Sequence, residues 1–122
     1  MLDGDFKIWP ILLVGVVAWY IIRSLGQIKL EEARRYLTEG AVLLDVRTPE
    51  EYSQDHIEGS VNLPLPHLLR EIGSVVKDKE TVILCHCLSG VRSGSAVSRL
   101  KRMGYRAYNI GSIHRAKKLA LL

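Results

Sequence analysis

The most informative stretch of the chain reads Thr81-Val82-Ile83-Leu84-Cys85-His86-Cys87-Leu88-Ser89-Gly90-Val91-Arg92-Ser93. An apolar, β-branched run ends on Cys87, passes through a short loop that carries glycine and arginine, and enters a segment with a helical pattern. Loop amides, a helix N-terminus and a nearby cation all favour the thiolate form of a cysteine. The stretch therefore predicts that Cys87 is an activated nucleophile and not an inert buried thiol.

The rest of the chain alternates predicted strands and predicted helices around this stretch. Apolar runs predict strands at 41–46, 81–85 and 105–110, and helical spacing predicts helices at 30–37, 65–76 and 93–103. Thr48 followed by Pro49 and Glu51 has the pattern of a helix N-terminus. With 122 residues the chain has room for one ordinary domain. The pattern predicts an α/β domain with a largely parallel sheet, and Cys87 at its carboxyl edge, where such folds bind ligands.

Three stretches together resemble the single-domain rhodanese family. They are Leu44-Asp45-Val46-Arg47-Thr48-Pro49-Glu50-Glu51-Tyr52, His56-Ile57-Glu58-Gly59-Ser60-Val61-Asn62-Leu63-Pro64, and Cys87-Leu88-Ser89-Gly90-Val91-Arg92-Ser93. The resemblance implies a three-layer fold with a central, mostly parallel five-stranded sheet flanked by helices. It also implies a sulfurtransferase that moves a sulfane sulfur through a cysteine persulfide in a ping-pong reaction.

The resemblance also implies which residues form the site. Cys87 matches the catalytic cysteine of the family, and the loop Leu88, Ser89, Gly90, Val91 and Arg92 matches its persulfide-binding loop. Three further residues, Asp45, Arg47 and Ser93, are expected to support this loop, although Asp45 and Arg47 could equally form a structural ion pair at a strand end. The expected partners are a small-molecule sulfur donor such as thiosulfate and a thiol or cyanide acceptor, with a protein acceptor as an alternative. No cofactor and no metal are expected.

Two other functions compete with sulfur transfer. Cysteine-dependent phosphatases and arsenate reductases also place a cysteine before an arginine loop, but they need five residues between the two, and four separate Cys87 from Arg92. The shorter loop suits a single sulfur atom better than a tetrahedral oxyanion. The second alternative is a non-catalytic rhodanese-like binding or sensing module at a membrane.

The second cysteine, Cys85, is expected to be a buried small hydrophobe, with the resolution of a persulfide as its alternative role. Two cysteines that are separated by one strand residue make a poor disulfide pair. This spacing suits a reducing compartment.

An uncharged run of 15 residues, Ile8 to Ile22, precedes the domain pattern between Lys7 and Arg23. As a helix it would span roughly 22 Å, and flanking residues would have to supply the rest of a ~30 Å bilayer core. We expect a retained single-pass anchor that meets the membrane through residues 6–25. A cleaved signal peptide is the main alternative. The expected organisation is an anchor and linker over 1–26 and a rhodanese-like domain over 27–122.

Charge predicts the orientation of this anchor. Arg23, Lys29, Arg34 and Arg35 follow the apolar run, which by the positive-inside rule places the domain on the cytoplasmic side of the inner membrane. The formal net charge is +4, and seven Lys and Arg but no acidic residue occur from Arg99 to Leu122. This basic end is expected to be a solvated face or a contact with a membrane surface. Nucleic-acid binding is not expected, since basic and aromatic residues do not interleave.

Overall fold

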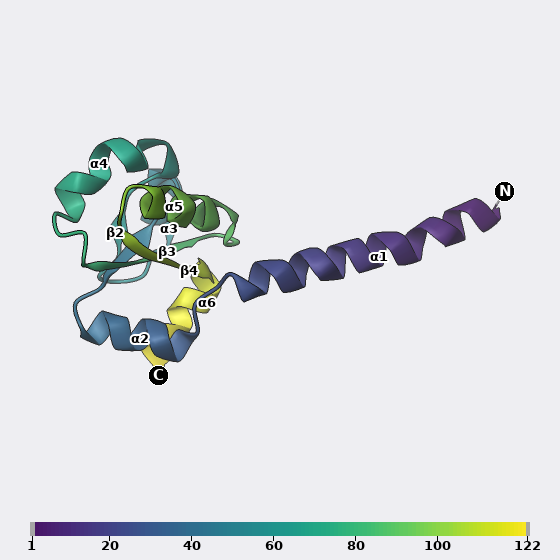
Figure 1. Cartoon of the computed structure of the whole chain (residues 1–122), viewed down its shortest axis with the longest axis horizontal. Helices are drawn as coiled ribbons and strands as arrows, with labels where there is room; N and C mark the ends of the chain where they lie inside the picture. The colour runs from purple at the N-terminus through teal and green to yellow at the C-terminus, as the bar shows by residue number, and fades with distance from the viewer. Residues whose placement is uncertain (1, 122) are drawn as a thin grey trace.

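The computed structural model describes the backbone of residues 2–121 and the side chains of residues 7–22 and 26–121. A parallel sheet with the strand order β2-β1-β3-β4 lies at the centre of the domain (Figure 1). Its strands are β1 (Val42–Asp45), β2 (Val61–Asn62), β3 (Val82–Cys87) and β4 (Arg106–Ser112). Every residue of β3 is buried, as expected for a central strand covered on both faces. The predicted α/β class with a parallel sheet is confirmed.

Helices cover both faces of this sheet. They are α2 (Leu30–Thr38), α3 (Pro49–Gln54), α4 (Leu68–Val75), α5 (Val91–Arg102) and α6 (Ile113–Lys117), with the short 3-10 helices η1 (Leu65–His67) and η2 (Lys118–Leu121). Helices α4 and α5 pack on one face around Leu44 and Ile83. Helices α2, α6 and η2 pack on the other around Leu43 and Leu84. Because strand side chains alternate, β3 contributes to both apolar cores, and three layers result.

The connection from β3 to α5 is a tight turn of three residues, Leu88 to Gly90. Gly90 has a φ of 97°, a left-handed conformation that costs glycine little and other residues more. Helix α5 begins at Val91, two residues before the Ser93 that the sequence pattern predicts. The first backbone amides of the helix therefore lie directly beside the end of β3.

Helix α3 begins with the predicted capping box. The backbone amide of Glu51 donates to Oγ1 of Thr48 at 3.2 Å, and the amide of Thr48 donates to Oε1 of Glu51 at 3.1 Å. Pro49 occupies the first turn, where the amide it lacks would have no partner within the helix. The cap fixes the start of α3 next to the carboxyl end of β1.

The sheet has four strands, so the expectation of a five-stranded sheet is wrong. The segment before α2 meets β4 only through an isolated parallel bridge between Gln27 and Asn109, with the amide of Ile28 donating to the carbonyl of Asn109 at 2.9 Å. Two features limit the pairing. Lys29 is already the N-cap of α2, and β4 is irregular where the left-handed Gly111 faces Gln27. A Cβ at Gly111 would lie 2.5 Å from Nε2 of Gln27, so this close approach requires glycine.

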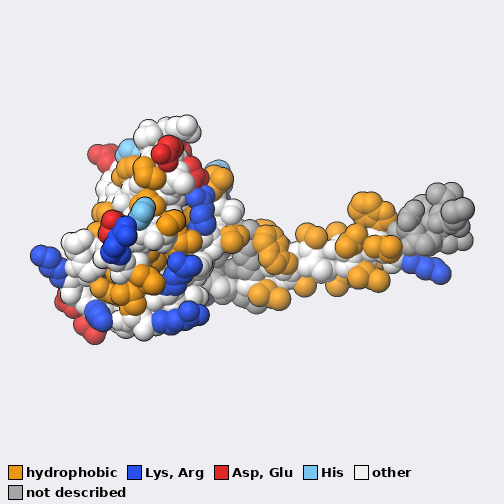
Figure 2. Space-filling view, turned by 90° about the horizontal axis from the view of Figure 1, so that it is seen from above, with side chains coloured by type: hydrophobic (Ala, Val, Ile, Leu, Met, Phe, Trp, Pro, Cys, Tyr) orange, Lys and Arg blue, Asp and Glu red, His pale blue; other side chains and the backbone are white. Residues whose placement is uncertain are grey.

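Helix α1 (Leu2–Leu25) projects away from the domain, with the N-terminus at its far end (Figure 1). Hydrophobic side chains lie at the surface along this helix in Figure 2, and Trp9, Ile11 and Ile22 are 69%, 72% and 70% exposed. Pro10 lies inside the helix and removes one backbone hydrogen bond from it.

The structure does not support the predicted membrane anchor over residues 6–25. Across the part of the chain that the structure describes, no helix combines the length and the apolar character that crossing a membrane requires. The single-pass topology, the inner-membrane localisation and the orientation that followed from the anchor are therefore not supported. The boundary between residues 26 and 27 stays a prediction.

A buried ion pair at the end of β1 joins the sheet to α3. Arg47 donates to Asp45 from Nε at 3.0 Å and from Nη2 at 2.8 Å, and Nη2 also donates to the carbonyl of Asp55 at 2.6 Å. Asp45 is fully buried and Arg47 is 4% exposed. Burial by itself would raise the pKa of Asp45, but its polar contacts with His86 and Arg47 outweigh burial and hold the pKa well below its usual range. The carboxylate therefore stays charged in the folded protein and depends on Arg47.

Replacing Arg47 with alanine should destabilise the fold strongly, because it leaves the charge of Asp45 buried without its main partner. We expect Arg47→Ala to lower the free energy of unfolding by about 3 to 5 kcal/mol, measured by urea denaturation at pH 7. Arg70→Ala is the matched control, since Arg70 is 73% exposed and lies 3.9 Å from Glu71. Such surface pairs contribute about 1 kcal/mol or less.

The same comparison has a defined pH dependence. In the wild type, the lowered pKa of Asp45 contributes stability that is complete above the unfolded pKa of about 3.9. That contribution is lost as the pH falls toward the folded pKa. In Arg47→Ala, Asp45 can be neutralised by a proton as the pH falls, so the gap between the two proteins should narrow in acid. A loss no larger than that of Arg70→Ala would contradict this account of the pair.

Candidate functional site

Cys87 ends β3 with its side chain buried on the face of the sheet that α5 covers. The backbone amide of Gly90 lies 2.9 Å from Sγ of Cys87, and the backbone amide of Ser93 lies 3.4 Å from it. Both amides belong to the loop or to the first turn of α5, whose orphan N–H groups point toward the sulfur. The sulfur therefore lies in a cradle of backbone donors.

The hydroxyl of Ser93 and the amide of Asn109 complete this cradle. Oγ of Ser93 lies 3.4 Å from Sγ of Cys87 and 2.7 Å from Oδ1 of Asn109, and one hydroxyl proton can serve only one of them at a time. Nδ2 of Asn109 donates to the carbonyl of Gly90 at 3.2 Å, and its Oδ1 accepts from the amide of Gly111 at 2.9 Å. Asn109 thus ties the loop to β4.

These donors lower the pKa of the Cys87 thiol. Burial alone would raise it, because a charged sulfur loses water. Hydrogen bonds from the Ser93 hydroxyl and from the amides of Ser93, Gly90 and Ser89 favour the thiolate and outweigh that effect. The first backbone amides of a helix have no hydrogen-bond partner within the helix, so they remain available to the sulfur whichever way the Ser93 hydroxyl points.

Cys85 differs from Cys87 in every respect that matters for reactivity. It is fully buried in the apolar core under α5, and burial, followed by the charge of Cys87, raises the pKa of its thiol. A thiol that stays protonated in a dry core is a poor nucleophile. The two cysteines are both free.

The guanidinium of Arg92 faces Glu51. Nη1 donates to Oε1 at 2.6 Å and Nη2 donates to Oε2 at 2.9 Å, a bidentate pair between α5 and α3. In the described part of the chain these are the hydrogen bonds of this side chain, so the expected support of the sulfur by Arg92 stays a prediction. The Arg92 contacts lower the pKa of Glu51 to about 2. Of the other loop residues, Leu88 is 60% exposed, Val91 is 58% exposed, and Ser89 is exposed.

Asp45 and Arg47 lie at the same edge of the sheet as Cys87 but do not reach its loop. Asp45 pairs in register with His86, and Nε2 of His86 lies 3.3 Å from Oδ2 of Asp45 without the alignment of a hydrogen bond. Arg47 contacts Asp45 and the end of α3. Their direct partners are thus each other and α3, which presents Glu51 to Arg92 from the side.

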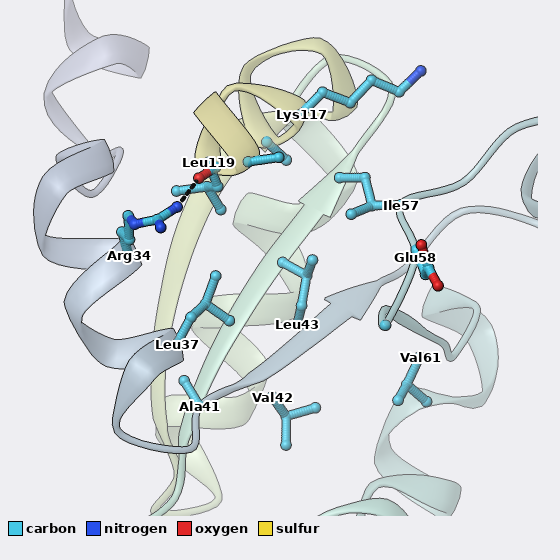
Figure 3. A pocket seen from close by; sticks show the side chains of 13 residues that line it. Arg34, Leu37, Ala41, Val42, Leu43, Ile57, Glu58, Val61, Lys117 and Leu119 are labelled. Atoms are coloured by element: carbon cyan, nitrogen blue, oxygen red, sulfur yellow. Dashed lines mark hydrogen bonds between the residues drawn. The ribbon is translucent and has the colours of Figure 1, made fainter. Parts of the chain in front are cut away.

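A separate cavity of about 460 Å³ lies on the opposite face of the sheet (Figure 3). Its walls come from α2, β1, the Ile57–Gly59 turn and the C-terminal helices, and Leu37, Leu43 and Leu119 make it largely apolar. None of its lining residues belongs to the Cys87 loop. Over the described residues, no group of three or more His, Cys, Asp or Glu side chains is placed to hold a metal ion.

The sequence pattern did not reveal the roles of Glu51 and Asn109 in this site. Glu51 has a complete local explanation as the third residue of a capping box, which concealed its second partner, 41 residues further along the chain. Asn109 lies in a strand and gave no motif of its own. Asn109 lies opposite Cys85 in the register of β3 and β4. A correct alignment of these two strands would therefore have placed Asn109 near the site.

Known proteins are similar to this chain over the α/β domain that carries Cys87. The rhodanese-like domain family matches residues 29–115. The thiosulfate sulfurtransferase PspE of Escherichia coli is 40% identical over 62 residues, which are 51% of this chain and 60% of that protein. A sulfurtransferase of Allochromatium vinosum is 37% identical over 68 residues, 56% of this chain and 62% of that protein. The chain thus spans less than two thirds of the length of these curated relatives.

Solved structures agree with the sequence relatives. A rhodanese with anions from Escherichia coli superimposes with a TM-score of 0.60 and 35% identity, covering 62% of this chain and 91% of that one. The human single-domain sulfurtransferase TSTD1 gives a TM-score of 0.63 and 25% identity, covering 76% of this chain and 96% of that one. With a matching fold, a matching sequence and a cysteine at the carboxyl edge of the sheet, the chain belongs to the rhodanese-like domain family.

Proposed function

We propose that this protein is a sulfurtransferase that carries a sulfane sulfur on Cys87. The observation that supports this best is the cradle around Sγ, in which the amides of Gly90 and Ser93 point at the sulfur and the pKa of the thiol is lowered. The relatives named as thiosulfate sulfurtransferase and sulfurtransferase support the same reaction class. Cys87 is the nucleophile, and the residues Leu88 to Arg92 form the loop that holds the persulfide.

The reaction has two half-steps in this proposal. The thiolate of Cys87 attacks the outer sulfur of thiosulfate, the S–S bond of the donor breaks, and sulfite leaves with the electron pair. The persulfide anion remains where the loop amides can stabilise its charge. In the second half-step a cyanide ion or a thiolate attacks the outer sulfur of the persulfide, and Cys87 is released as a thiolate. The enzyme alternates between two stable forms, which is ping-pong behaviour.

The supporting residues shape the site in this proposal, and of them only Ser93 also contacts the sulfur. Ser93 and Asn109 hold the loop in the shape that directs its amides at Sγ. Asp45 and Arg47 fix α3, and α3 in turn holds the guanidinium of Arg92 through Glu51. Asn109, Asp45 and Arg47 are positioning residues, Ser93 also donates to the thiolate, and none of the four reacts. A protein acceptor would fit the exposed Leu88 and Val91 beside the thiol.

Loading of Cys87 with sulfur is the direct test. We expect the protein, incubated with millimolar thiosulfate, to gain the mass of one sulfur atom in intact mass spectrometry and to lose it again on treatment with cyanide or a thiol. Cys87→Ser should abolish the gain. Cys85→Ala is the matched control and should load normally, because Cys85 is buried and protonated. A sulfur gain that persists in Cys87→Ser would refute the assignment of the nucleophile.

The pH dependence of loading tests the cradle. Because the pKa of Cys87 is lowered, the loading rate should rise with pH and level off below the ~8.5 at which a free cysteine ionises. Ser93→Ala removes one donor to the thiolate, so its profile should inflect at higher pH and meet the wild-type rate in alkaline solution. Ser98→Ala, an exposed serine of the same helix, should keep the wild-type profile. A uniform loss of rate at all pH values in Ser93→Ala would contradict an effect on the pKa of the thiol and would show that the hydroxyl only positions the loop.

A further inference from the structure

Arg92 is the positive charge that a negatively charged donor would meet beside the thiol. Arg92 directly precedes Ser93 in the first turn of α5, and the amide of Ser93 lies 3.4 Å from Sγ of Cys87. The hydrogen bonds and charge of Glu51 raise the pKa of the Arg92 guanidinium, and the charge of Cys87 raises it further. The loop residues Leu88 to Val91 carry no charge of their own. Attraction of an anionic donor to this loop therefore depends on how available the Arg92 charge is.

The guanidinium of Arg92 is already paired with a carboxylate of the same protein, that of Glu51. Glu51 meets Arg92 with both oxygens, at 2.6 and 2.9 Å, and so fills the two-pronged geometry in which a guanidinium binds an oxyanion. Two further donors hold the same carboxylate, since the amide of Thr48 lies 3.1 Å and its hydroxyl 3.2 Å from Oε1. Glu51 is therefore fixed at the N-terminus of α3 and does not swing freely at the surface.

This arrangement has opposite consequences for two kinds of sulfur donor. The leaving group of thiosulfate carries anionic oxygens, and these would have to displace Glu51 from Arg92 or remain without a cation. The leaving group of an organic persulfide carries no anionic oxygens, so it does not need to pair with Arg92. Its carbon chain can instead lie against the exposed apolar side chains of Leu88 and Val91, which are 60% and 58% exposed.

We propose that Glu51 selects the sulfur donor by occupying Arg92, so that the site disfavours thiosulfate and favours a low-molecular-weight organic persulfide. The proposal rests on sulfur transfer through Cys87 and identifies the donor class for that site. In the favoured reaction the Cys87 thiolate attacks the outer sulfur of R–S–SH. The new bond joins Sγ to that sulfur, the donor S–S bond breaks, and the electron pair leaves on R–S. The proton of the donor moves to this leaving thiolate, which gives R–SH and a persulfide anion on Cys87.

Glu51→Gln is the variant that tests this selection. Glutamine keeps the size of the side chain and can still complete a capping box, but it removes the negative charge that competes for Arg92. We expect the KM for thiosulfate to fall about tenfold with kcat nearly unchanged, as one charge-assisted contact is released. The ratio of kcat/KM for thiosulfate to kcat/KM for cysteine persulfide should therefore rise about tenfold.

Glu50→Gln provides the matched control. Glu50 lies beside Glu51 in the first turn of α3 and is exposed, so the variant changes the net charge equally without touching Arg92. Its KM for thiosulfate should remain at the wild-type value. A fall in KM of equal size in both variants would overturn the proposal in favour of a general charge effect. A rise in KM, or an equal loss of kcat with both donors, would show instead that Glu51 only holds Arg92 in place.

Sulfate binding gives a second readout that needs no turnover. Isothermal titration with sulfate should show weak or undetectable binding to the wild type and at least tenfold tighter binding to Glu51→Gln, lost again in the double variant with Arg92→Ala. Equal affinity in the wild type and Glu51→Gln would refute the selection. This result is independent of sulfur transfer, whereas a failure of Cys87 to load from either donor would refute the proposed function itself.

Discussion

The hydrogen bond from the Gly90 amide to the Cys87 sulfur is the contact on which the site depends. It exists because β3 gives way to α5 within three residues, and because glycine can take the left-handed conformation that such a short turn requires. The turn brings the unpaired amides of a new helix against the end of a buried strand, where little water competes with them. A thiol in that place is drawn toward its charged form by the backbone itself.

Helix α3 links this turn to the rest of the domain. It is only six residues long, yet one of its ends receives Arg47 and the other carries Glu51. The buried Asp45–Arg47 pair therefore fixes the platform from which Glu51 holds Arg92. Three segments that lie far apart in the sequence reach one edge of the sheet in this way, as the parallel strands all end there.

The sequence indicates the local parts of the fold well and the contacts between them poorly. The strand that ends on Cys87, the capped start of α3 and the helix after the loop each follow from a pattern within a dozen residues. The Glu51–Arg92 pair depends on the placement of α3 against α5, which no local pattern encodes. The fifth strand was wrong for a similar reason, since the N-cap of α2 at Lys29 and the irregularity of β4 at Gly111 limit its pairing with β4. The anchor is not supported, because no helix among the described residues combines the length and the apolar character that crossing a membrane requires.

The burial of Cys85 affects how the protein would survive oxidation. Cys85 and Cys87 point to the same side of β3 and lie about 6.6 Å apart along it, with side chains that run parallel instead of converging. The chain contains no third cysteine. If peroxide converted Cys87 to a sulfenic acid, no thiol of the same molecule could close a disulfide over it. Reduction of Cys87 would then require a thiol from another molecule. The oxidation state of this one sulfur atom would therefore follow the concentration of reducing thiols around the protein.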